Sequence, residues 1–173
     1  MFNESFVGHS YCIRSGSCIL MSYASEHTNS LPYDDRGYAD AILQLGDKAL
    51  SWAFSGPRYE QEVYERAKGC TNMPEETVGR VYVQGLSMTN CPEIVRLFDK
   101  HPTAGGSHCH FPTKLCAPLG REVVYLGGMT TFIKESEWPA FCTRQTQLLA
   151  SEGFSAETAR KMLAMDEPKT KIR

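Results

Sequence analysis

The first half of the chain alternates apolar runs with polar, glycine-containing breaks. Two short apolar-rich runs, residues 6–14 and 17–24, flank Ser15-Gly16, and a two-residue loop that ends in glycine favours a β-hairpin. Farther along, an apolar stripe at helical spacing predicts a helix that Asp34 or Asp35 caps. The residues of this stripe are Tyr38, Ile42, Leu45, Ala49 and Trp52. Ser55 and Pro57 predict the start of a second helix, which Gly69 ends.

The middle and the C-terminal part continue the alternation. Residues 78–83 alternate and are rich in β-branched side chains, which predicts a strand, and Asn90 with Pro92 predicts a short helix over residues 90–100. Residues 121–126 and 129–133 predict strands around a Gly127-Gly128 turn. We expect two final helices, residues 136–151 capped by Ser136 and ended by Gly153, and one that begins at Ser155.

This order of elements predicts an α+β fold. With hairpins at both ends, we expect a mainly antiparallel sheet of about five strands with about five helices. The 173 residues contain no internal repeat and no Pro-, Gly- or Ser-rich linker, so residues 1–165 are expected to form a single compact domain. Residues 166–173 are expected to be a charged C-terminal tail.

The charge balance excludes some classes of partner. Eighteen basic and twenty acidic side chains give a net charge of −2, which offers no overall field for nucleic acid or an anionic membrane. The longest apolar runs have four residues, whereas a bilayer-spanning helix needs about 20. Residues 1–10 have neither a basic leader nor a long apolar stretch, so we expect a cytoplasmic protein that has no membrane partner. The oligomeric state stays open.

The number and spacing of the cysteines agree with the expected cytoplasmic location. The seven cysteines are an odd number without a recognisable zinc spacing, and in a reducing cytosol we expect most of them to be buried thiols. If the protein were secreted, three disulfides and one free thiol would be possible.

The residues that can carry chemistry gather between residues 101 and 116. This segment holds three of the five histidines and two of the seven cysteines. Zinc needs four nitrogen or sulfur ligands, and His108, His110 and Cys116, joined by His101 or Cys109, are the candidate set. The alternative is an exposed polar loop whose histidines have no such role.

Thiol catalysis is a second possibility for the same segment. Cys109 lies between two histidines, and a neighbouring imidazole can hold a cysteine as the nucleophilic thiolate. Cys109 and His101 are therefore the candidate catalytic residues. Adjacent residues rarely face each other, so Cys109 would need a partner from elsewhere, such as His9 or His27.

One stretch resembles a known enzyme superfamily. Residues 81–83 followed by the sequence Cys-Pro-Glu-Ile-Val-Arg-Leu-Phe-Asp-Lys at residues 91–100 look similar to the late strand and helix of GNAT acyltransferases. This resemblance covers about twenty residues and implies acyl transfer from acyl-coenzyme A. The pyrophosphate-binding turn of that superfamily has no counterpart in the chain.

Two functions follow from these observations. The first is a small cytoplasmic accessory or regulatory protein that binds another macromolecule, with a protein as the expected partner, because no complete catalytic or cofactor signature is present. The alternative is an enzyme with its site around residues 101–116, either a zinc-dependent hydrolase or a GNAT-like acyltransferase.

Overall fold

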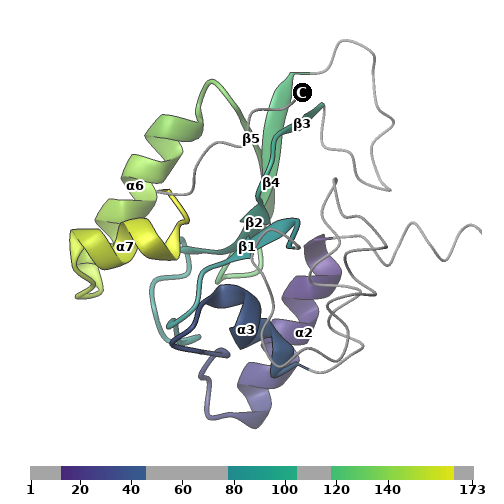
Figure 1. Cartoon of the computed structure of the whole chain (residues 1–173), viewed down its shortest axis with the longest axis vertical. Coiled ribbons are helices and arrows are strands. Elements are labelled where there is room, and N and C mark those ends of the chain that lie inside the picture. Colours follow the sequence, from purple (N-terminus) through teal and green to yellow (C-terminus); the bar gives the residue numbers. More distant parts are fainter. Residues whose placement is uncertain (1–12, 46–77, 105–117, 166–173) are drawn as a thin grey trace, which may run out of the picture.

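The computed structural model describes residues 13–45, 78–104 and 118–165, and Figure 1 shows the chain. The elements in chain order are α2 (Ile13–Glu26), α3 (Tyr38–Leu43), β1 (Arg80–Tyr82), β2 (Val95–Asp99), β3 (Thr103–Ala104), β4 (Leu119–Tyr125), β5 (Thr130–Lys134), α6 (Trp138–Ser151) and α7 (Ala156–Met162). The predicted α+β class is confirmed. None of the helices in these three ranges is long and apolar enough to cross a bilayer.

A single five-stranded sheet forms the centre of the described structure. All of its ladders are antiparallel, as predicted. Strands β2 and β3 pair one after the other with the same side of β4, because Phe98 lies opposite Val123 and Ala104 lies opposite Leu119. The spatial order is therefore β1, then β2 with β3, then β4, then β5, which leaves β1 and β5 as the edge strands.

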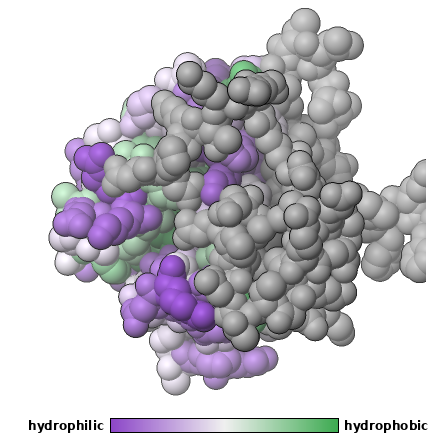
Figure 2. All heavy atoms as spheres, viewed as in Figure 1, coloured by the Kyte–Doolittle hydropathy of each residue, from purple (hydrophilic) through white to green (hydrophobic). Residues whose placement is uncertain are grey.

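Helices lie on both sides of this sheet, as Figure 1 shows. On one side, α6 packs its rings against the strands: Trp138 is 5.3 Å from Phe98 and Phe141 is 6.5 Å from Tyr125, measured between ring centroids. Toward the other side lie α2 and α3. The buried apolar side chains of all these layers form one core cluster, including Leu20, Ile42, Leu97, Val124 and Leu149. In Figure 2 mostly hydrophilic residues cover the outer side of the described part, with hydrophobic ones between them near α6 and α7.

The predicted N-terminal hairpin is wrong. Residues 13–24 belong to helix α2, and Ser15-Gly16 lies inside its first turns rather than in a turn between strands. Ile13, Ser17, Leu20 and Ala24 are buried at spacings of three to four residues, so the apolar pattern has the helical period. A glycine in a helix interior lowers the stability of the helix by about 1 kcal/mol relative to alanine. The burial of this apolar stripe outweighs that loss. Residues 6–12 lie outside the described ranges.

The predicted helix over residues 90–100 is also wrong. Residues 95–99 form β2, and all five are buried, because β2 is an inner strand between β1 and β4. Ile94, Leu97 and Phe98 recur at helical spacing, but Val95 between them is fully buried as well, as expected for a strand that is covered on both faces. The GNAT resemblance needs a helix at this place, so it loses its structural basis.

Several other predictions are confirmed. The strand at residues 78–83 is β1, the hairpin around Gly127-Gly128 is β4 and β5, and the two C-terminal helices are α6 and α7. Ser155 caps α7 by accepting a hydrogen bond from the Thr158 amide, and Gly153 has the positive φ of 94° that ends a helix. The predicted helix at residues 55–68 and the tail at 166–173 lie outside the described ranges.

Two predicted caps are shifted. Gly37 rather than Asp34 or Asp35 is the N-cap of α3, and Glu137 rather than Ser136 is the N-cap of α6. Asp34 instead accepts a hydrogen bond from the Arg36 amide at 2.9 Å, which stabilises the turn before the helix. The described part of the predicted helix from Tyr38 is α3, which ends at Leu43; the expected positions Ala49 and Trp52 lie beyond the described residues.

Candidate functional site

Charged side chains are buried on the side of the sheet that faces α2 and α3. Phe98 contacts Trp138 on the α6 side, so its neighbour Asp99 points to the opposite side. The same alternation puts Glu122 on that side, because Val123 is the partner of Phe98. Arg80 is opposite Asp99, and Arg96 bonds to α2. We refer to Arg80, Arg96, Asp99 and Glu122 as the charged cluster; each is at least nine-tenths buried.

Asp99 holds one end of this cluster together. Its Oδ1 accepts a hydrogen bond from Arg80 Nε at 3.3 Å, and its Oδ2 accepts one from the Glu122 amide at 3.1 Å. One carboxylate therefore joins β1, β2 and β4. A buried ion pair keeps its stability only while both charges and their hydrogen bonds are present.

Polar contacts continue from the cluster toward its rim. Lys100 Nζ lies 3.4 Å from the Tyr38 hydroxyl on α3, and Arg121 Nη1 donates to the Lys100 carbonyl at 2.7 Å. Arg121 also pairs with Glu135 at 3.1 Å and lies 4.4 Å above the Trp138 ring. His101, a predicted site residue, follows Lys100 directly and is half-buried. His101 therefore comes just after the end of β2 that carries Asp99.

The remaining predicted site residues lie outside the described ranges: His108, Cys109, His110 and Cys116. The two ends of their segment are adjacent, because Ala104 and Leu119 are paired across β3 and β4. Within residues 13–45, 78–104 and 118–165, no group of three or more His, Cys, Asp and Glu side chains could hold a metal ion. The zinc site and the thiol site therefore stay predictions.

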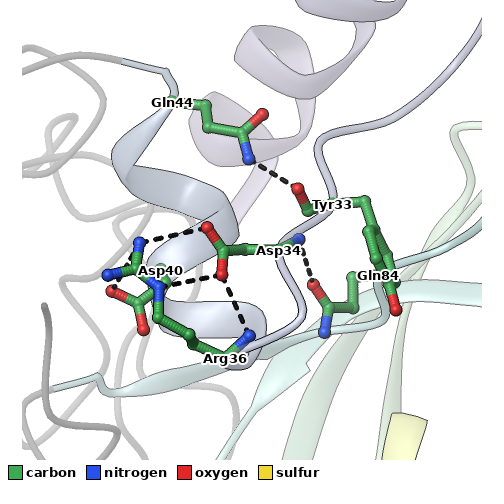
Figure 3. A network of polar contacts seen from close by, with 6 residues as sticks. All are labelled: Tyr33, Asp34, Arg36, Asp40, Gln44 and Gln84. Atoms are coloured by element: carbon green, nitrogen blue, oxygen red, sulfur yellow. Dashed lines mark hydrogen bonds and ion pairs between the residues drawn. The ribbon is translucent and has the colours of Figure 1, made fainter.

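A second polar network connects the loop before α3 to the sheet (Figure 3). The Asp34 amide donates to Gln84 Oε1 at 3.1 Å, and Gln44 Nε2 donates to the Tyr33 carbonyl at 2.6 Å. Arg36 Nε donates to Asp34 Oδ1 at 3.0 Å, and a guanidinium nitrogen of Arg36 lies 3.7 Å from Asp40. These contacts fix the loop in one shape at the surface.

The electrostatic environment follows from these contacts. The hydrogen bond from Arg36 lowers the pKa of Asp34 below its ordinary value. The hydrogen bond to Asp35 and its charge raise the pKa of Tyr33. Burial raises the pKa of Tyr82 well above its ordinary value, and its hydroxyl donates to the Pro32 carbonyl at 2.9 Å. Tyr82 is therefore a neutral anchor between β1 and the loop before α3.

Known sequence motifs do not indicate the charged cluster, but the positions of charged residues within the predicted strands do. In the predicted strand at residues 78–83, Arg80 is on the same alternating face as Val78 and Tyr82, and the other face is apolar as well. Glu122 likewise lies in the predicted strand at residues 121–126, directly before its apolar residues 123–126. Charges of opposite sign at inward positions of different strands are the pattern that would have indicated a buried ion pair.

Comparison of the chain with protein-family models, curated protein sequences and solved structures found no match.

Proposed function

We propose that this chain is a small accessory or regulatory protein that binds another protein by accepting an extended segment of it along strand β5. The observation that carries this proposal is the open edge of β5. In the described residues β5 pairs with β4 alone, through five consecutive residue pairs without a bulge. Main-chain hydrogen bonds along such an edge are a common way to bind an extended peptide.

The hydrogen-bond pattern tells which groups of β5 point outward. The Tyr125 amide donates to the Met129 carbonyl, and the Glu135 amide donates to the Leu119 carbonyl. Because hydrogen-bonded pairs alternate along an antiparallel ladder, Thr131 and Ile133 bond to β4. The amides and carbonyls of Thr130, Phe132 and Lys134 are thus directed away from β4.

The side chains around this edge support the proposal. Met129 and Leu119 are 64% and 57% exposed, and the alternation puts both on the same face of the sheet as Thr131 and Ile133. A partner strand with apolar side chains at alternate positions would continue this apolar face beyond β5. Exposed edges are usually protected by proline, bulges or several charges, whereas Lys134 is the one charged residue of β5 and the strand has no proline.

The test uses proline to remove outward amides. Thr130→Pro and Lys134→Pro each delete one outward N–H but no hydrogen bond to β4, so the fold should persist. Immobilised wild-type protein should capture a protein partner from a lysate of its source, and the partner should be identified by mass spectrometry. Each proline variant should weaken that binding about fivefold, because one main-chain hydrogen bond is lost.

Thr130→Val is the matched control, because it changes the side chain and keeps the amide. It should bind the partner as the wild type does. Hydrogen exchange should show new protection of the amides of residues 130, 132 and 134 in the complex. A partner that is held equally by the wild type and by both proline variants would show that β5 is not the docking edge.

A further inference from the structure

A bulge in β2 turns Arg96 toward α2. Val95 lies opposite Tyr125 and Leu97 lies opposite Val124, so two steps along β2 match one step along β4, and Arg96 is the extra residue. A bulge of this kind re-aims the side chain of the inserted residue. The Arg96 guanidinium reaches α2, where Nη2 donates to Ser17 Oγ. Arg96 is 0% exposed.

Arg96 differs from its neighbour Arg80 in having no carboxylate partner among the described residues. Arg80 pairs with Asp99, whereas the hydrogen-bond partners of Arg96 are Ser17 Oγ and, at 3.9 Å, the Met88 sulfur. Its Nε is buried and has no hydrogen-bond partner in the described part of the chain. Arg96 is thus a buried positive charge whose contacts are neutral.

An uncompensated buried charge costs several kcal/mol, and an arginine cannot avoid this cost by losing its proton. Burial lowers the pKa of Arg96, while the nearby Cys18 thiol and Tyr82 hydroxyl raise it. Tyr82 is buried, but Cys18 is at an exposed position of α2. The guanidinium therefore lies near an exposed residue of α2.

We propose that Arg96 and Ser17 form a binding site for the oxyanion group, a carboxylate or a phosphate, of a small molecule. The guanidinium offers the unused Nε–H beside its Nη2, which is the planar edge that carboxylates and phosphates bind. The Ser17 hydroxyl can donate to the same group. This site is independent of the β5 edge.

The first experiment is a titration of the intact protein with sodium acetate and with sodium phosphate, each compared with sodium chloride at equal ionic strength. Saturable stabilisation of the thermal midpoint by acetate, by phosphate or by both, beyond that by chloride, is the expected result. The stronger of the two salts identifies the group. Equal responses to all three salts would overturn the proposal.

Variants locate the site. Arg96→Met should abolish the specific response, whereas Arg144→Met, which removes an exposed arginine that pairs with Glu93, should keep it. Ser17→Ala keeps the charge and should weaken oxyanion binding about fivefold through loss of one hydrogen bond; it decides the question if Arg96→Met does not fold. An unchanged affinity in Ser17→Ala, or an unchanged response in Arg96→Met, would overturn the proposal.

Discussion

The two sides of the sheet are built from different interactions. On the α6 side, aromatic rings of the helix pack on Phe98 and Tyr125, and the Gln145 side chain satisfies the buried Val95 amide at 2.8 Å. On the α2 side, two arginines and two acidic side chains are buried among apolar residues. Apolar burial stabilises in proportion to area and needs no partner, whereas a buried charge stabilises only if its partner stays. The α2 side is therefore the one that a single substitution can most easily unbalance.

The largest expected effect on the α2 side comes from the substitution Asp99→Ala. This change removes the carboxylate that accepts hydrogen bonds from Arg80 and from the Glu122 amide. We expect the free energy of unfolding to fall by about 3–5 kcal/mol, measured by urea titration. Glu135→Ala, which removes the partner of the less buried Arg121, is the control and should cost less than about 1 kcal/mol. Equal losses would show that burial of the pair has no special weight.

The corresponding change on the other side is Leu149→Ala in α6. Leu149 is fully buried, so the substitution removes apolar contacts and leaves a cavity. We expect a loss of about 3 kcal/mol that is the same in low and high salt, because no charge is involved. The neighbouring Leu148 is partly buried, and Leu148→Ala should cost less. A strong salt dependence for Leu149→Ala would contradict the apolar character of this side.

The thiols on the two sides should differ in reactivity. Cys142 on α6 is buried, and burial raises the pKa of its thiol, whereas Cys18 on α2 is exposed. At pH 8 Cys142 should react with iodoacetamide about tenfold more slowly than Cys18, because less thiolate is present and access is poorer. Peptide mass spectrometry gives both rates in one sample, and in urea they should become similar. Equal rates in the native protein would contradict this prediction.

The smallest effect concerns the exposed network in Figure 3. The pKa of Asp34 is lower in the folded chain than its ordinary value of 3.8, because Arg36 donates hydrogen bonds to the carboxylate. The stabilisation is therefore present above about pH 4 and is lost as the pH falls through the folded pKa. The melting temperature of Asp34→Asn should lie below that of the wild type at pH 6, and the difference should shrink toward pH 2. A constant difference would exclude this linkage.

The sequence pattern predicted the secondary structure correctly where the signals for an element lie within or next to that element. The hairpin of β4 and β5 needs the Gly127-Gly128 turn, and Gly128 has the positive φ of 85° that glycine tolerates. The final helix needs its Ser155 cap, which accepts a hydrogen bond from the Thr158 amide. Such signals lie within a few residues of the element that they specify, so the sequence alone is enough to predict them.

The hydrophobic pattern predicted the wrong secondary structure where contacts with distant parts of the chain decide the conformation. Residues 90–100 fit a helical stripe, but pairing with β1 and β4 on both sides makes residues 95–99 an inner strand. Residues 13–24 fit a hairpin, but burial of Ile13, Leu20 and Ala24 against the sheet makes them helical. In both segments, contacts with distant parts of the chain outweigh a local preference of about 1 kcal/mol.

The candidate site was predicted only in part. The sequence identified His101 and the histidine-rich segment that follows it, but it gave no reason to place the end of β2 beside Arg80 and Glu122. By itself, the sequence determined the class of fold, the hairpin of β4 and β5, the helices α6 and α7, and the near-neutral charge. Only the tertiary structure decided that Arg80 meets Asp99 and that Arg96 lies buried without a carboxylate among the described residues, because partners brought together by strand pairing are far apart in the chain.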